Sequence, residues 1–322
     1  MNLPTYDQLP VSADQPPGSS WGLWGDHDVF GCLNLLTPER VLAAAGCIRR
    51  GAVFRLDLDL ATPDPPLFGR SAYKHEVSGT GEIGHDDSLS DYNTQSSSQW
   101  DGFRHIRNPV HGFYGGVADE SHGIHHWAER GIVGRAVLAD VGRWRASVGR
   151  PLDMNAADPI EPSELLDTLQ AQGSQVETGD VLLIRTGWVG WYRTLDGPAR
   201  QALAVRFASP GLRPGEATAR LLWDLHVAAV AADNPALELW PITGLATDAE
   251  RSAARSDPSL MVDHFVHLRL LPLLGLPIGE LWDFEGLADD CASDGVYHSF
   301  LTSAPLNVPS GVASPPNAYA IK

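Results

Sequence analysis

Short apolar runs alternate with segments of helical periodicity through the second half of this chain, and this alternation constrains the fold more than any other feature. Runs typical of buried strands lie at residues 136–141, 180–188 and 227–234. Helical periodicity appears between them, at residues 162–173 and 215–226. Because strands and helices alternate, we expect an α/β layer arrangement.

The flanking segments predict further elements. Thr37 is suited to cap, and Pro38 to begin, a helix near the N-terminus. Residues 53–60 alternate apolar and polar side chains, which predicts a half-buried strand. A helix is expected over residues 263–275, ended or bent by its proline, and the tail at 299–321 is typical of edge strands around a proline-rich turn.

The composition excludes several classes of protein. The 322 residues include 40 acidic and 23 basic side chains, and the formal charge of −17 is unsuited to binding nucleic acid or an anionic membrane surface. Three cysteines are too few for a disulfide framework or a cysteine zinc site. Residues 1–20 lack the features of a secretory signal, and the most apolar stretch, 265–276, is too short to span a bilayer. We therefore expect a soluble cytoplasmic protein.

Residues 61–123 form a long irregular stretch, which inside a compact domain is usually functional or disordered. The segment GTGEIG at 79–84 matches the glycine spacing of a dinucleotide-binding loop. We interpret it as a flexible loop, because its flanks predict neither the strand before nor the helix after that the motif requires. His122 and His126 have the four-residue spacing of a helical metal pair, but Gly123 lies between them, so capping or surface roles are favoured.

The densest group of reactive side chains lies at residues 94–116. Asp101 and His105 are four residues apart there, and Gln95 and Gln99 precede them. A carboxylate and an imidazole are the groups that divalent metals bind, and also the pair that general acid–base catalysis needs. The spacing alone does not say which of these uses applies.

The order of segments along the chain resembles the cyclase family of metal-dependent hydrolases, which includes bacterial kynurenine formamidase, isatin hydrolase and trans-dienelactone hydrolase. The similarity covers residues 25–322, from DVFGCLNLLTPERV through GDVLLIRTGW to APLNVPSGVASPPNAYAI. It implies a single domain of the swivelling β/β/α class over residues 26–322, with residues 1–25 as an extended N-terminal arm.

The family motif, His-x-Gly-Thr-His-x-Asp-x-x-x-His, aligns its metal-binding aspartate with Asp101 and its catalytic acid/base with His105. The resemblance implies two further metal ligands, at His267 and Glu280. His264, one turn before His267, is a less favoured substitute.

This chain departs from the motif at its first two histidines, which align with Gln95 and Gln99. An amide oxygen is a weaker and harder ligand than an imidazole nitrogen. The ligands that remain are two carboxylates and one imidazole, which suit Mn²⁺ or Mg²⁺ better than Zn²⁺. We expect one divalent ion, manganese, zinc or magnesium, and a site without metal is the alternative.

The resemblance implies a metal-dependent hydrolase of a small cyclic amide, lactone or formamide. An ion would activate water and polarise the carbonyl, His105 would transfer the proton, and Gln95 and Gln99 would orient the water or stabilise the oxyanion. One alternative is a metal-independent cyclase, dehydratase or isomerase of secondary metabolism that uses His105, Asp101 and Glu280. The other alternative is a small-molecule binder without catalysis.

Four aromatic residues in the same stretch, Trp100, Phe103, Phe113 and Tyr114, are expected either to line an apolar substrate pocket or to pack the loop. Members of the family assemble as dimers or tetramers, so the resemblance implies a homodimer or homotetramer. The arm at 1–25 suits a contact between subunits, and a disordered tail is the alternative.

Overall fold

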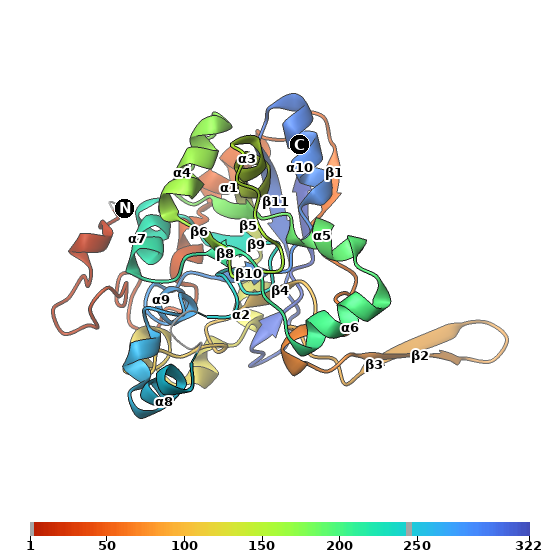
Figure 1. The fold of residues 1–322 in the computed structure, drawn as a ribbon, viewed down its shortest axis with the longest axis horizontal. Coiled ribbons are helices and arrows are strands. Elements are labelled where there is room, and N and C mark those ends of the chain that lie inside the picture. The colour runs from red at the N-terminus through yellow and green to blue at the C-terminus, as the bar shows by residue number, and fades with distance from the viewer. Residues whose placement is uncertain (1–2, 243–246) are drawn as a thin grey trace.

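A mixed sheet of nine strands crosses the molecule (Figure 1) in a computed structural model that describes residues 3–242 and 247–322. In order across the sheet, the strands are β1 (Val53–Arg55), β13 (Ala318–Ile321), β11 (His298–Ser303), β5 (Ile132–Asp140), β7 (Val181–Arg185), β9 (Ala229–Ala232), β10 (Ile278–Glu280), β4 (Gln99–Asp101) and β12 (Ala313–Ser314).

The strands β5, β7, β9 and β10 run parallel and form the centre of the sheet. The strands β5, β7 and β9 overlap the three expected strands, whereas β10 was not predicted. Their residues are almost all buried because helices pack on them. The helices are α1 (Pro38–Ala45), α2 (His125–Arg130), α3 (Val141–Ser147), α4 (Pro162–Ala171), α5 (Trp188–Thr194), α6 (Gly197–Val205), α7 (Glu216–Asp224), α8 (Asp248–Ser256), α9 (His267–Leu270) and α10 (Glu285–Asp294). The expected α/β arrangement is confirmed. As predicted, Thr37 caps α1 and accepts a hydrogen bond from the Arg40 backbone.

Three predicted elements differ from the structure. The strand expected over residues 53–60 stops at Arg55, because the side chain of Asp57 accepts the hydrogen bond of the Ala318 backbone where the ladder would continue. The helix expected over 263–275 is reduced to α9, and residues 263–266 form turns instead. The tail does not consist only of edge strands: β11 and β13 lie inside the sheet, with β1 outside them.

The irregular stretch contains a long hairpin that stands away from the body (Figure 1). Its strands, β2 (Lys74–Gly79) and β3 (His85–Ser90), pair with each other and are exposed along their whole length. The GTGEIG segment forms the turn between them, so a strand does precede it, but a second strand follows where a dinucleotide-binding loop needs a helix. The base of the hairpin carries Arg70 on one side and Gln95 on the other.

Residues 3–25 of the N-terminal arm lie against their own chain, while residues 1–2 fall outside the described residues. Tyr6 is buried, and its backbone N–H donates to Asp224 over 2.7 Å. The indole of Trp223 donates to the Pro4 carbonyl over 2.9 Å. The arm is therefore anchored on α7 of its own subunit, and its role between subunits stays a prediction. None of the described helices has the length and apolar character needed to cross a membrane.

Candidate metal centre

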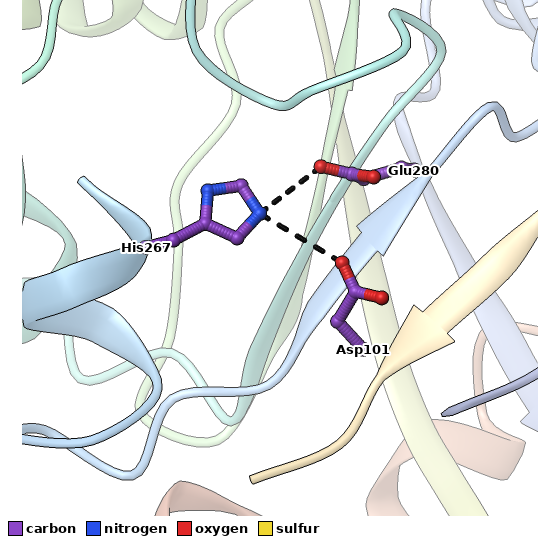
Figure 2. Close-up of side chains that lie close together, drawn as sticks. All are labelled: Asp101, His267 and Glu280. Carbon is purple, nitrogen blue, oxygen red and sulfur yellow. Dashed lines mark ion pairs between the residues drawn. The ribbon is translucent and has the colours of Figure 1, made fainter. Parts of the chain in front are cut away.

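The antiparallel pairing of β4 with β10 assembles the centre. The register places Gln99 opposite Glu280 and Asp101 opposite Ile278. Side chains alternate between the two faces of a strand, so Gln99 and Asp101 lie on one face and Trp100 on the other. His267, the first residue of α9, completes the group, and Figure 2 shows its ring directed at both carboxylates.

Asp101, His267 and Glu280 form a buried cluster with the geometry of a metal site. His267 Nε2 lies 3.1 Å from Glu280 Oε1 and 3.7 Å from Asp101 Oδ2 (Figure 2). The three ligand atoms all lie within 4.8 Å of one another. Ligands about 2.1 Å from one ion are about 3.0–3.4 Å from each other. Asp101 Oδ2 is also buried without a hydrogen-bond partner among the described residues. These residues therefore fit a single divalent ion.

Glu238, which the sequence analysis did not identify, holds the imidazole of His267. Its Oε2 and Oε1 lie 2.8 and 3.0 Å from His267 Nδ1, and Glu238 is completely buried. A carboxylate can only accept, so Nδ1 carries a proton and donates, and Nε2 faces Asp101 and Glu280. The sequence does contain one indication of this residue, because Glu238 is an acidic residue in the apolar segment that follows the buried strand β9.

The two glutamines support the carboxylates. Gln95 Nε2 donates to Asp101 Oδ1 over 2.6 Å, and Gln99 Nε2 donates to Glu280 Oε2 over 2.5 Å. Because carboxylates only accept, the amide nitrogens of both glutamines must face them. These contacts occupy one oxygen of each carboxylate and leave Asp101 Oδ2 and Glu280 Oε1 to face His267. The orientation of water by Gln95 and Gln99 stays a prediction.

His105 lies at the rim of the centre. Its side chain is 21% exposed, and its Nε2 is 3.9 Å from Asp101 Oδ2. Gln95 Nε2 lies 3.1 Å from its Nδ1. This position between the centre and solvent suits the proton transfer that the resemblance implies. His264, the substitute considered for His267, is not part of the cluster.

Burial and charge shift the pKa values of these groups in opposite directions. Burial, with the charge of Asp101 added, raises the pKa of Glu280 to about 7. Burial also lowers the pKa of His105. Burial opposes the charged forms of His267 and Asp101, but Glu238 and Asp101 raise the pKa of His267 well above its usual value, and His105 and His267 lower that of Asp101. The acidic surroundings of His267 therefore favour a cation at this point.

Arg70 is a second residue that the sequence analysis missed. Its Nη1 donates to the Gln95 carbonyl over 2.5 Å and to Gln99 Oε1 over 3.3 Å. The guanidinium therefore lies beside both glutamines, and its charge lowers the pKa of Asp101 and Glu280. No local pattern distinguishes Arg70 in the irregular stretch of the sequence.

Of the four aromatic residues expected either to line a pocket or to pack the loop, three pack the interior. Trp100, Phe103 and Tyr114 are at most 2% exposed and belong to the hydrophobic core. Trp100 lies on the opposite face of β4 from Asp101, and its indole donates to Ser303 Oγ over 2.9 Å. Phe113 is half-buried. His122 lies in the same core region and contacts the Tyr114 carbonyl over 2.7 Å, away from the metal cluster.

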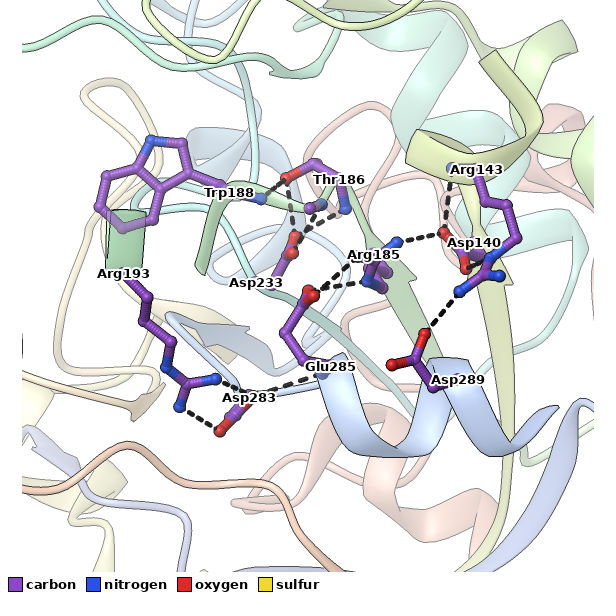
Figure 3. A network of polar contacts seen from close by, with 11 residues as sticks. Asp140, Arg143, Arg185, Thr186, Trp188, Arg193, Asp233, Asp283, Glu285 and Asp289 are labelled. Carbon is purple, nitrogen blue, oxygen red and sulfur yellow. Dashed lines mark hydrogen bonds and ion pairs between the residues drawn. The ribbon is translucent and has the colours of Figure 1, made fainter. Parts of the chain in front are cut away.

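A separate polar network joins the carboxyl ends of the parallel strands (Figure 3). Arg185 at the end of β7 pairs with Asp140 and with Glu285 of α10, each over 2.8 Å. Asp233, just after β9, accepts hydrogen bonds from the backbone and hydroxyl of Thr186 and from Gly187. Burial raises the pKa of Asp233 to about 6. These groups pair with one another and fix α5 and α10 on the sheet.

The fold and site together define an α/β protein with a carboxylate–imidazole centre at the pairing of β4 and β10. The model of the Cyclase family, whose description reads "Putative cyclase", matches residues 39–239. This chain belongs to that family. Among curated protein sequences, none matches it.

Solved structures agree with this assignment. A crystal structure described as a novel cyclase is 31% identical, with a TM-score of 0.79, and the match covers 94% of this chain and 99% of that one. The likeness confirms the expected cyclase-like fold. Isatin hydrolase A from Labrenzia aggregata is 17% identical over 88% of this chain and 97% of its own, with a TM-score of 0.54. The enzyme of the same name from Ralstonia solanacearum is 16% identical over 89% and 98%, also with a TM-score of 0.54.

Proposed function

We propose that this protein is a metal-dependent hydrolase of a small cyclic amide, lactone or formamide. One observation carries the proposal: Asp101 Oδ2, which is buried and has no hydrogen-bond partner among the described residues, converges with His267 Nε2 and Glu280 Oε1. A divalent ion bound there supplies a polarised carbonyl and a water of lowered pKa. Manganese, zinc and magnesium are the candidates, and the two carboxylates favour the harder ions.

The chain's own residues supply the remaining steps. Glu238 holds the ring of His267, and Gln95 and Gln99 hold the two carboxylates, so the centre is rigid before substrate arrives. His105 reaches both the centre and solvent, and it takes the proton of the attacking water and returns it to the leaving group. Water adds to the carbonyl carbon, the C–N or C–O bond breaks, and a carboxylate and an amine or alcohol result.

The names of related proteins support the choice of reaction. Isatin hydrolases share this fold, and isatin is a cyclic amide. Another isatin hydrolase structure, 12% identical with a TM-score of 0.55, is described as bound to a product analogue, thioisatinate. These identities are low, so they suggest the class of reaction and leave the substrate of this chain open.

A second candidate is metal-independent acid–base catalysis by His105, Asp101 and Glu280 in a cyclase, dehydratase or isomerase. It is favoured by the contacts of Gln95 and Gln99, whose amide groups stabilise both carboxylates by hydrogen bonds without an ion. The positive charge of a protonated His267 would then offset part of the negative charge of the carboxylates.

The first test is the metal content of purified protein, measured by plasma mass spectrometry, together with a screen of lactones, formamides and cyclic imides. We expect about one Mn, Zn or Mg per chain. Asp101→Asn should lose both the metal and hydrolysis, whereas Asp87→Asn, on the exposed hairpin, should keep both. Turnover that survives EDTA, with no metal bound after soaking in Mn²⁺ or Zn²⁺, would favour the second candidate.

A further inference from the structure

Asn234 is completely buried just after β9, and its side chain binds three carbonyl groups of the backbone. Its Nδ2 lies 2.8 Å from the carbonyl oxygen of Pro210, and 3.2 Å from those of Leu237 and Glu238. An amide nitrogen only donates, so these contacts fix the orientation of the side chain. Its Oδ1 is buried without a hydrogen-bond partner among the described residues. An unpaired buried acceptor is costly, so the contribution of Asn234 lies in what its nitrogen binds.

The bonds from Asn234 fix the backbone that carries the Glu238 side chain. The carbonyl groups of Leu237 and Glu238 belong to the two peptide groups on either side of the Glu238 Cα atom, and both accept from Asn234 Nδ2. Leu237 is buried and has a φ of +54°, in the left-handed region that bulky residues avoid. Such a backbone persists only where its surroundings hold it. Asn234 therefore stabilises the turn from which Glu238 reaches His267.

The backbone of Asn234 reaches the other glutamate that contacts His267. Its carbonyl oxygen accepts a hydrogen bond from the Leu281 backbone over 3.1 Å. Leu281 directly follows Glu280, and it too is buried, with a φ of +55°. Each of the two glutamates is thus next to a left-handed leucine. The side chain of Asn234 binds the turn at Glu238, and its backbone binds the turn at Glu280.

Gly211 packs against the same turn from β8 (Gly211–Leu212). A Cβ atom at this position would overlap the Glu238 carbonyl group and would lie 2.6 Å from Asn234 Nδ2. Only a residue without a side chain therefore allows β8 to lie this close. The Glu238 backbone is enclosed between Asn234 and Gly211, which leaves it little room to shift.

We propose that Asn234 is a positioning residue of the centre. It fixes the backbone of Glu238, Glu238 holds the imidazole of His267, and Nε2 of that imidazole meets the ion. Asn234 is not one of the candidate ligands, so it acts through Glu238. The contact between Glu238 and His267 is present without an ion, whereas the effect on metal binding rests on the proposed function.

The Nδ1–H proton of His267 reports on this arrangement with or without metal. A proton between an imidazole and a buried carboxylate gives a low-field signal in the NMR spectrum and exchanges slowly with water. His267→Gln identifies the signal by its loss. Asn234→Leu keeps the branched shape of the side chain but removes its donors, and we expect it to speed the exchange at least about tenfold. An exchange rate equal to that of the wild type would overturn the inference.

Two further variants test the same role. Gly211→Ala displaces the Glu238 carbonyl without changing Asn234, so it should speed the exchange as Asn234→Leu does. Asn34→Ala removes two side-chain hydrogen bonds from a half-buried asparagine outside the cluster, and it should leave the signal unchanged. If Asn34→Ala speeds the exchange as much as Asn234→Leu, the effect is a general loss of stability and the inference fails.

Competition titration with Mn²⁺ measures the effect on the centre. Asn234→Leu should weaken Mn²⁺ binding about tenfold, because the imidazole of His267 is held less firmly. In a Glu238→Gln background the same substitution should weaken binding at most about threefold further, since Asn234 acts through Glu238. Equal losses in the two backgrounds would show that Asn234 does not act by this route.

Metal content and the lactone screen on the wild type test the proposed function separately. A wild type that binds metal and opens a lactone, with an exchange rate that Asn234→Leu does not change, refutes only the role of Asn234. A wild type without metal refutes only the metal-dependent reaction. The exchange rates of the His267 proton in the wild type and in Asn234→Leu then decide the role of Asn234.

Discussion

Glu238 Oε2 lies 2.8 Å from His267 Nδ1, and both side chains are at most 3% exposed. The contact fixes the ring so that its other nitrogen meets Asp101 and Glu280 (Figure 2). Glu238 is therefore a positioning residue that acts through His267, although it lies in a different segment of the chain.

Replacing Glu238 with glutamine removes the charge but keeps an oxygen that can accept from Nδ1. We expect Glu238→Gln to weaken metal binding about 10–100-fold, because the imidazole becomes a poorer ligand. Competition titration with Mn²⁺ measures the change. Glu82→Gln, in the exposed turn of the hairpin, is the matched control. An unchanged affinity in Glu238→Gln would show that its contact with His267 is only structural.

His105 is predicted to act in catalysis and not in metal binding. Because its side chain reaches solvent at the rim of the cluster, His105→Ala should lower kcat about 10²–10⁴-fold while the metal content stays the same. Steady-state kinetics and plasma mass spectrometry on one preparation measure both quantities. His85→Ala on the hairpin should leave them unchanged. Full activity in His105→Ala would remove the role assigned to this residue.

A substitution at Trp100 tests whether this residue packs the core or contacts the substrate. It is completely buried, and its indole N–H donates a hydrogen bond to Ser303 Oγ. The centroids of its ring and of the Trp282 ring are 4.8 Å apart. Trp100→Phe should lower the free energy of unfolding by roughly 1–3 kcal/mol, through a small cavity and the loss of the hydrogen bond from the indole to Ser303, and should leave KM unchanged. Urea unfolding and kinetics measure the two effects. A raised KM with normal stability would instead place Trp100 in the substrate pocket.

Asp233 should make the stability depend on pH. Burial raises its pKa from 3.8 to about 6, so between these values the folded chain binds more protons than the unfolded chain. The contribution of Asp233 to stability therefore falls as pH rises from 4 to 8, by roughly 2 kcal/mol. Asp233→Asn removes this dependence. The stability difference between variant and wild type should shift by that amount in favour of the variant from pH 4 to pH 8, and a constant difference would contradict the prediction.

Contact with a second copy of the chain would account for the exposed apolar side chains of the hairpin. Val77, Ile83 and Leu89 are 63%, 95% and 49% exposed on it, and a two-stranded hairpin alone is only marginally stable. We expect a homodimer or homotetramer whose mass in solution falls when residues 73–91 are replaced by a short glycine-serine turn. Deleting residues 1–25 tests the arm separately, and an unchanged number of subunits would rule the arm out as the contact between them. A monomeric wild type would refute the expectation.

Parts of the fold follow from local pattern. The apolar runs that contain β7 and β9 predicted buried strands, because residues covered on both faces must be apolar throughout. The cap at Thr37 fixed the start of α1 in the same local way. The length of α9 could not be read from periodicity, since turns at 263–266 replace the first part of the helix that its apolar residues suggest.

Local patterns in the sequence predicted the strands β5, β7 and β9 and the helices between them, and the resemblance identified the candidate residues Asp101, His105, His267 and Glu280. How these residues meet depends on the tertiary structure. The pairing of β4 with β10 brought Asp101 and Glu280 together, and Arg70 and Glu238 reach the centre from two other segments of the chain. Periodicity reports which face of an element is buried, whereas these contacts join residues that are far apart in the chain and depend on strand order.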